Sequence, residues 1–428
     1  MNQLKTRAAE AAADTDDARA GDPLPGTLPE ALRAELIAFR RDLHMHPELG
    51  NQEFRTTAAI TARLERAGLA PRVLATGTGL VCDIGTDPAA SAAVDPGAAP
   101  AAARPALALR ADIDALPIPD TKTVDYRSTV PGRAHACGHD VHTTVVLGAG
   151  LVLAGLAREG LLPRPVRLLF QPAEEVLPGG AVDAIESGAL DGVGRILAVH
   201  CDPHVDAGRI GLRTGPITSA CDRLEVTLDG PGGHTARPHL TTDLVTAAAR
   251  VAVDVPALLA RRADTRAGLA VTWGRLESGH TCNVIPQHAE LSGTVRCLDL
   301  AAWRQAPDLV HAAIDEIAAL HGAKSQINYV RGVPPVVNEA TSAQLLHDAM
   351  AARRGAHTVE GTEQSLGGED FSWYLERVPG AMARLGVRPP GQAGRYDLHR
   401  GDFDVDERAI EVGVELFTAA ALLDGNCP

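Results

Sequence analysis

The sequence predicts an α/β protein: a main α/β sandwich around a central, mostly parallel sheet, with a smaller ferredoxin-like α+β domain inserted into it. The chain has 428 residues, too many for one ordinary hydrophobic core, so two domains are expected. In its first half, helical patterns alternate with short apolar runs, which is typical of βαβ units. Near Thr214 the pattern changes to strands with two long helices between them.

The elements of the main domain follow from the spacing of apolar residues. A helix is predicted over residues 28–44, where apolar residues recur on one face, and a second over 56–67, where Gly68 ends it. A third helix, over 143–157, lies between two short apolar runs of the kind buried in parallel sheets. These strand-like runs occupy residues 79–84, 106–110, 166–170 and 195–200.

The inserted domain is predicted from a βαββαβ order, the ferredoxin-like signature. Strands are expected at 223–228, 270–277, 289–297 and 325–330, with helices at 244–260 and 301–320. The chain crosses between the two domains at 214–220 and 331–337, which would form a hinge. We therefore divide the chain into a flexible N-terminal arm (1–26), the first part of the main domain (27–216), the inserted domain (217–331) and the second part of the main domain (332–428). An enlarged surface loop is predicted over residues 87–104, which are nearly all Ala, Pro, Gly and Asp.

Charge and composition exclude several classes of partner. The formal net charge of −14 argues against nucleic acid and anionic membranes, which need clustered Lys and Arg. No uninterrupted apolar run approaches the roughly 20 residues of a membrane span. Seven cysteines without a CxxC pair do not form a disulfide framework and fit reduced thiols. A cytoplasmic location is expected.

A dense cluster of metal-binding side chains occupies residues 135–142. It holds three histidines, Cys137 and Asp140 within eight residues. A thiolate and an imidazole two residues apart, Cys137 and His139, can point to one side of a loop and share a metal ion. The alternative is a polar helix start with a buried cysteine, but the density of ligands favours a metal site.

Further acidic and imidazole side chains follow the predicted strands. Glu174 and Glu175 come after the strand at 166–170, and His200 ends the strand at 195–200. Asp114 follows the strand at 106–110 in the same way. Because ligands bind at the carboxyl ends of strands in open α/β sheets, we expect one shared crevice. Of the adjacent acids, one is expected to be a ligand and the other a base. His399, near the C-terminus, is a further candidate.

The inserted domain offers a second set of polar residues. A glycine-dense loop at 230–239 presents His234 and His239, while Asn283 precedes the strand that contains Arg296. A tight hairpin and an Asn turn explain the loop and Asn283 equally well from sequence alone.

At these residues the sequence resembles the aminoacylase-type metallopeptidase/amidohydrolase family, which also includes dipeptidases and carboxypeptidases. The most similar branch is that of N-acyl-amino-acid, hippurate and auxin-conjugate amidohydrolases. The matching segments occur in order over most of the chain: RRDLHMHPELG (40–50), LRADIDALPI (109–118), HACGHDVHT (135–143), FQPAEE (170–175), GGHTARPH (232–239), NVIP (283–286), GTVR (293–296), GGEDFSWYLERVPG (367–380) and LHRGDFDVDE (398–407).

The resemblance implies roles for the residues that match its motifs. It implies two divalent metal ions per subunit, Zn²⁺ or Mn²⁺, with Co²⁺ or Ni²⁺ also compatible. Glu174 corresponds to the general base, Asp114 to the acid that supports the metal site, and His234 to the residue that polarises the scissile carbonyl, sometimes across a dimer. Asn283, Arg296 and His239 are assigned to substrate binding. The metal ligands correspond to Cys137, His139, Glu175, His200 and His399.

The implied fold and activity agree with the residue-based interpretation. A catalytic α/β domain with an inserted lid or dimerisation domain would hydrolyse the amide bond of a small N-acyl amino acid, as a homodimer or homotetramer. Three positions depart from the family pattern, Asp202, Gly368 and Arg400, and they put the substrate preference in doubt. Two alternatives stay open: a dipeptidase or aminopeptidase with the same metal core, and a non-catalytic ligand-binding relative.

Overall fold

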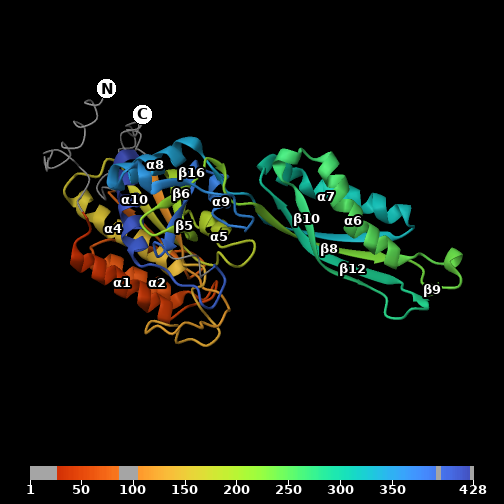
Figure 1. Ribbon diagram of the computed structural model, residues 1–428. Helices are drawn as coiled ribbons and strands as arrows, with labels where there is room; N and C mark the ends of the chain where they lie inside the picture. The colour runs from red at the N-terminus through yellow and green to blue at the C-terminus, as the bar shows by residue number, and fades with distance from the viewer. Residues whose placement is uncertain (1–26, 86–104, 392–396, 425–428) are drawn as a thin grey trace, which may run out of the picture.

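The computed structural model describes residues 27–85, 105–391 and 397–424. The arm predicted over 1–26 and the loop predicted over 87–104 lie outside the described residues. Figure 1 shows two bodies: a larger one built on one sheet, and a narrower one that projects from it and contains a second sheet.

The larger body is built on a sheet with the order β1-β2-β4-β3-β5-β16-β6-β15. Its central strands β4, β3, β5 and β16 run parallel to one another, while β2 pairs antiparallel with β4. Nearly every residue of β3 and β16 is buried, as expected for parallel strands covered on both faces. The strands are β1 (Arg72–Val73), β2 (Leu80–Ile84), β3 (Ala106–Asp112), β4 (Val166–Gln171), β5 (Val193–Asp206), β6 (Ile210–Leu212), β15 (Val359–Gly361) and β16 (Gly380–Arg388).

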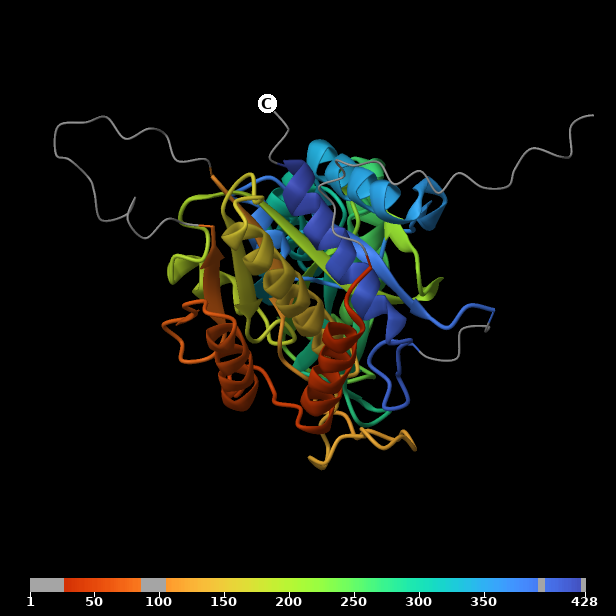
Figure 2. The ribbon, with the colours of Figure 1, turned by 90° about the vertical axis from the view of Figure 1, so that its left-hand side faces the viewer.

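Helices cover both faces of this sheet. Alternate residues of β3, such as Leu109 and Ala108, belong to different hydrophobic clusters, one on each face. Figure 2 shows α1, α4 and α10 side by side over one face. That face packs against α1 (Glu30–Met45), α2 (Phe54–Arg66), α4 (His139–Arg158), α8 (Ala340–Arg354) and α10 (Arg408–Asp424). The other packs against α5 (Ala181–Glu186) and α9 (Ser372–Leu375).

Helix α4 has the length and composition of a membrane span, with 20 residues and a mean hydropathy of 1.6 in its most apolar window. It also lies in the core, where 72% of that window is buried against the rest of the protein. Such burial explains its apolar character, because the core helix of a folded domain meets the same criteria. Helix α4 is not an uninterrupted apolar run, since Asp140, His142 and Thr143 fall within it, so the expectation that no such run approaches about 20 residues is not contradicted.

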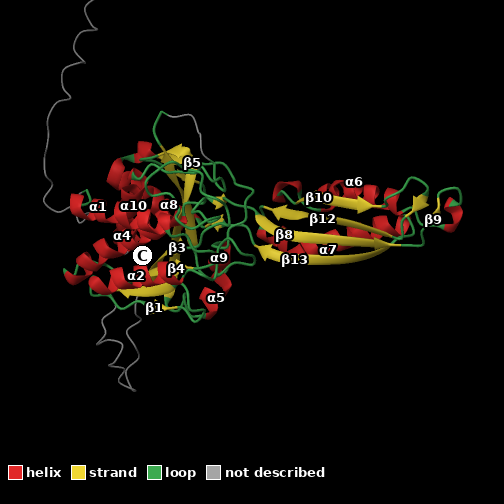
Figure 3. Cartoon of the chain, turned by 90° about the horizontal axis from the view of Figure 1, so that it is seen from below, coloured by secondary structure: helices red, strands yellow, loops and turns green. Residues whose placement is uncertain are grey.

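The projecting body, which we call the lid, has the predicted βαββαβ order. Its strands β8 (Ala220–Asp229), β10 (Ala270–Ser278), β12 (His288–Cys297) and β13 (Lys324–Val333) are all antiparallel, in the order β10-β12-β8-β13. Alternate residues of β8 are buried, because α6 (Leu244–Arg262) and α7 (Leu300–Leu320) cover only one face. Figure 3 shows these strands running along the length of the lid. The predicted fold class is confirmed.

Short elements complete the described chain. Where the chain crosses into the lid and back, β7 (Gly215–Pro216) pairs with β14 (Val337–Asn338). At the far tip of the lid, β9 (Gly233–His234) pairs with β11 (Val284–Ile285). The 3₁₀ turns are η1 (Pro238–Leu240), η2 (Thr265–Ala267) and η3 (Ala356–Thr358).

Two elements differ from the sequence prediction in ways that affect the site. Helix α4 begins at His139, so His139 and His142 lie in its first turn and not in a preceding loop. Strand β5 continues to Asp206, so His200 lies inside a strand and not at its end. Strand β3 pairs with β5 only as far as Ala198, and β5 then continues along β16. His200 therefore still faces the open end of β3.

Candidate metal centre and active site

The first pair of ligand candidates forms where α4 begins. Gly138, between Cys137 and His139, has φ +86°, and a Cβ there would come within 2.7 Å of Cys201 Sγ. Glycine therefore allows this turn to lie against β5. The turn places Cys137 Sγ 3.5 Å from His200 Nε2. Sulfur and nitrogen ligands of one tetrahedral zinc ion lie about 3.6 Å apart, as their bond lengths of about 2.3 and 2.0 Å require.

Asp114 orients two other members of the site. His139 Nδ1 donates to the Asp114 carbonyl at 3.0 Å and lies 3.1 Å from its Oδ1, while the Glu175 amide donates to Oδ2 at 3.0 Å. His139 Nε2 is thereby directed into the site, where it is buried and has no hydrogen-bond partner among the described residues. It lies 3.8 to 4.0 Å from oxygens of Asp112, Glu175 and Glu174, too far for hydrogen bonds. A bound cation would satisfy these atoms together.

Strained backbone presents the remaining acidic and imidazole groups. Ala173, just before Glu174, has φ +56°, and its amide donates to the buried Glu53 Oε1 at 2.8 Å. His399 has φ +60°, and its amide donates to the Ala136 carbonyl at 2.8 Å. Left-handed backbone at non-glycine residues costs free energy and clusters at functional sites. His399 Nε2 lies 3.2 Å from Glu175 Oε1, which closes the cluster from its open side.

The donor set fits a pair of divalent cations. Thiolate, imidazole and carboxylate groups from distant parts of the chain have ligand atoms within 4.8 Å of one another in overlapping groups. His200 Nδ1 donates to the Cys201 carbonyl at 2.8 Å, which leaves Nε2 free to bind a metal. The structure thus brings all five predicted ligands together: Cys137, His139, Glu175, His200 and His399.

The site concentrates negative charge in a buried space. Burial raises the pKa of Glu174 well above its usual range, and the nearby Glu369 and Glu175 raise it further. Burial likewise raises the pKa of the Cys137 thiol, again with a contribution from Glu175. Both shifts favour the neutral form until positive charge is present, so bound cations would return both groups to their anionic forms.

The two buried imidazoles respond in opposite directions. Burial alone would lower the pKa of His139, but Asp112 and Asp114 outweigh it and raise the pKa to about 10. For His200, burial and the positive charge of Arg384 lower the pKa well below its usual range. His200 is therefore neutral and able to bind a metal ion. His139, in contrast, is surrounded by carboxylates whose negative charge a bound cation would balance.

Sequence reasoning left several residues of the site without a role. His142 was one of the clustered histidines, but its Nδ1 donates to Asp112 Oδ1 at 2.6 Å and its Nε2 accepts from the Cys201 amide at 2.8 Å. Because both of its ring nitrogens form hydrogen bonds within the protein, His142 supports the site and is not a candidate metal ligand. Glu369 and Asp370 lie within ligand distance of Glu174. In the sequence, both residues lie in the GGED segment at 367–370, and this motif is the signal that points to them.

The lid residues divide into two groups. Arg296 lines the cavity, and its Nη1 donates to the Leu366 carbonyl. His234 and Asn283 do not line the cavity. His234 aligns with Val284 in the β9–β11 pair at the far tip of the lid. His239, in the adjoining η1 turn, is exposed there as well. Within one chain, the length of the lid separates these three residues from the metal site, so their predicted roles would need a second chain, as the resemblance implies for His234.

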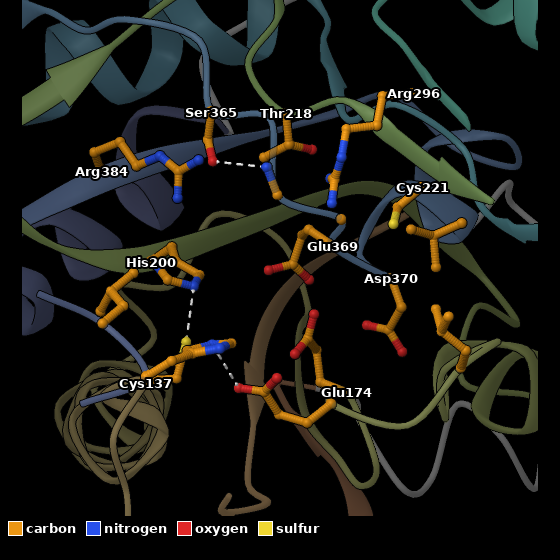
Figure 4. A pocket seen from close by; sticks show the side chains of 17 residues that line it. Cys137, Glu174, His200, Thr218, Cys221, Arg296, Ser365, Glu369, Asp370 and Arg384 are labelled. Carbon is orange, nitrogen blue, oxygen red and sulfur yellow. Dashed lines mark hydrogen bonds and ion pairs between the residues drawn. The ribbon is translucent and has the colours of Figure 1, made fainter. Parts of the chain in front are cut away.

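A cavity of about 350 Å³ opens directly above the ligands. Figure 4 shows Cys137, His200 and Glu174 at one end and Arg384, Thr218 and Arg296 at the other. Gly368 lines this cavity, and a Cβ there would come within 3.0 Å of Cys221 and Val333. Asp202 and Arg400 are not among the lining residues.

Comparison with known proteins agrees with this geometry. The model of peptidase family M20/M25/M40 matches residues 108–423. N-acetyl-L-cysteine deacetylase of Bacillus subtilis is 37% identical over 397 residues, which are 92% of this chain and 90% of that protein. A Rhodococcus jostii protein named glutamate–cysteine ligase 2-3 is 45% identical over 91% of this chain, but this chain spans only 47% of its length.

A solved structure is similar over nearly the whole chain. The YXEP protein of Bacillus subtilis, described as a dinuclear metal binding peptidase from the M20 family, has a TM-score of 0.79 and 32% identity, covering 94% of this chain and 100% of that one. The resemblance inferred from the motifs is confirmed. The chain belongs to peptidase family M20/M25/M40, a family of metal-dependent hydrolases.

Proposed function

We propose that the protein hydrolyses the amide bond of N-acyl amino acids, releasing a carboxylate and a free amino acid. The observation that supports this most strongly is the convergence of the five ligand candidates with Glu174 beneath one cavity. The relative named for deacetylating N-acetyl-L-cysteine, 37% identical to this chain, supports the same substrate class.

The five ligand candidates would hold two divalent cations, Zn²⁺ or Mn²⁺, with Co²⁺ or Ni²⁺ compatible with the same donors. Bound there, the cations supply Lewis-acid chemistry, lowering the pKa of a water molecule toward about 7 and polarising the amide carbonyl. Glu174 takes the proton of the attacking water on a carboxylate oxygen and passes it to the nitrogen of the leaving amine. Asp114 acts as a positioning residue, since it holds both His139 and the Glu175 backbone.

The distal lid residues lead to a second part of the proposal. His234 and Asn283 belong to the loop and strand ends that meet at the tip of the lid, far from the metal site of their own chain. We propose a dimer in which the His234 ring of one copy donates a hydrogen bond to the amide oxygen in the other. Asn283 of that copy and Arg296 of the host chain then bind the amino acid's α-carboxylate.

The general base is tested by Glu174→Gln in the metal-loaded protein. We expect kcat to fall by about 10²- to 10⁴-fold on N-acetyl, N-benzoyl and longer N-acyl amino acids, with metal content unchanged. Glu175→Gln is the matched control, because it should lose bound metal as well as activity. A dipeptide panel run in parallel separates peptidase from amidohydrolase activity. Near-full turnover by Glu174→Gln would sink the assignment of the base.

A further inference from the structure

Arg384 is a buried cation in the wall of the cavity. It lies in β16 and aligns with His200 of the parallel strand β5, so both side chains leave the sheet on the same face. Only 6% of Arg384 is exposed, and it lines the same cavity as Cys137. Figure 4 shows its guanidinium beside Ser365, on the cavity wall above His200.

The guanidinium of Arg384 forms no direct ion pair in the part of the chain that the structure describes: burial lowers its pKa, and the more distant charges of Asp202 and Glu369 offset this only in part. Its Nη2 is buried without a hydrogen-bond partner, and no described carboxylate forms an ion pair with it. The other deeply buried arginines differ: Arg40 lies 2.7 Å from Asp140, and Arg110 lies 2.7 Å from Asp112. A buried charge that lacks a partner is costly, and at the wall of a cavity an incoming anion can remove that cost.

Ser365 lies beside this cation, and Thr218 lies next to Ser365 along the same wall of the cavity. Thr218 and Ser365 face one another in an isolated parallel bridge, and both line the cavity. The Thr218 hydroxyl accepts from the Val336 amide at 3.3 Å, and the Ser365 hydroxyl accepts from the Gly367 amide at 3.1 Å. Neither donates its own hydrogen to an acceptor among the described residues. Both hydrogens are therefore available to an anion that lies against this wall of the cavity.

We propose that Arg384, Ser365 and Thr218 form a carboxylate subsite for an acidic group of the substrate other than the α-carboxylate. A planar guanidinium flanked by hydroxyl donors matches a carboxylate in geometry and charge. The α-carboxylate is assigned to Arg296, farther along the same cavity. This inference rests on the proposed function and narrows it to N-acyl amino acids with a second carboxylate, either in the acyl group or in the amino-acid side chain.

Matched substrate pairs test the subsite and separate the two sources of the carboxylate. N-acetyl-L-glutamate against N-acetyl-L-glutamine tests the side chain, and N-succinyl-L-alanine against N-pentanoyl-L-alanine tests the acyl group. In at least one pair, we expect wild-type kcat/KM to favour the acidic member by about 10-fold or more. Arg384→Met should bring that ratio close to one, and Arg384→Lys should keep part of it.

Arg388→Met is the control variant. Arg388 lies four residues further along β16, but it is half-buried, pairs with Asp206 at 2.7 Å and does not line the cavity. Its substitution should leave the substrate ratio at the wild-type value. Thermal unfolding of each variant checks that the fold is retained.

Two results would overturn the subsite. One is a wild-type protein whose kcat/KM shows no preference in either substrate pair. The other is an Arg384→Met variant whose kcat/KM falls equally on both members of a pair, which would show that Arg384 only supports His200. If wild type cleaves none of these four substrates and none of the N-benzoyl or longer N-acyl amino acids, the proposed function fails instead. Binding of glutarate and pentanoate to the metal-loaded protein then decides: a glutarate preference that Arg384→Met abolishes supports the subsite, and its absence refutes it.

Discussion

Arg110 is the cation that balances the acids beneath the metal site. It is fully buried, and its nitrogens lie 2.7 Å from Asp112, 2.7 Å from Asp370 and 3.2 Å from Glu369. Burial raises the pKa of Asp370 to about 8; Arg110 lowers it only in part, while Glu369 raises it further. The arrangement therefore holds several buried carboxylates together and depends on one guanidinium for charge balance.

Arg110→Met should therefore destabilise the protein by about 3–5 kcal/mol, because it leaves buried carboxylates without a partner. Urea unfolding measures the loss, and Asp112→Asn in the same chain should recover part of it, because Asp112 is the ionised partner of Arg110 and the change removes its charge. Arg209→Met, which breaks an exposed pair with Glu360, should cost at most about 1 kcal/mol. Equal losses for the two arginine variants would contradict this account.

At the residue scale, sequence identified the groups that lie in short motifs and missed those defined by contacts. Cys137, His139 and the Glu174–Glu175 pair stand out because several donors occur within a few positions. Arg384 looks like an ordinary strand residue in the sequence, and its role depends on its register with His200 and on which partners it lacks. Such properties come from the assembled sheet, so no local pattern could predict them.

Helix α8 shows how one side chain begins an element. The Glu339 carboxylate caps α8 by accepting from the amides of Thr341 at 2.8 Å and Ser342 at 2.7 Å. Burial alone would raise the pKa of Glu339, but these bonds to its ionised form outweigh burial and lower the pKa from 4.5 to about 2. The carboxylate is therefore held ionised at the start of the helix.

Glu339→Ala should cost about 1 kcal/mol at neutral pH through the loss of this cap. Because the folded pKa is depressed, the stabilisation is complete above the unfolded value of 4.5 and is lost as the pH falls toward about 2. The difference between variant and wild type in urea unfolding should thus shrink between pH 7 and about pH 3. The exposed Glu363→Ala serves as a control, and a difference independent of pH would contradict the assignment.

Element types were predictable from periodicity, but two boundaries were not. The helix expected from 143 begins at His139, because Gly138 turns the chain with a left-handed φ and no side chain supplies a cap signal. The strand expected to end at His200 continues to Asp206, because β16 pairs with it beyond the point where β3 leaves. Both boundaries depend on distant chain segments.

At the scale of the whole molecule, the succession of strand and helix patterns along the chain was enough to predict an inserted ferredoxin-like domain. It was not enough to predict how far that domain extends from the main domain. The motif match placed His234 and Asn283 at the active site, whereas the length of β8 and β12 carries them to the far tip of the lid. Connectivity is encoded along the chain, but the distance between two ends of a domain follows only from its packed shape.

The proposed dimer predicts complementation between two inactive variants. Glu174→Gln lacks the base, and His234→Ala lacks the residue expected to act in the other copy. When the two are unfolded, mixed and refolded, half the dimers should be mixed, and each should contain one intact site, giving about a quarter of wild-type activity. Each variant refolded alone is the control. No recovery in a mixture shown to contain mixed dimers would refute action across the two copies.

The strand order of the main sheet has a consequence for biosynthesis. Strands β5 and β6 are near neighbours in sequence, yet β16, made some 170 residues later, lies between them. A ribosome must therefore release the entire lid before the centre of the first sheet can close. Until then the nascent chain exposes the unpaired edge of β5, next to His200, so premature termination before Gly380 leaves a chain prone to aggregate.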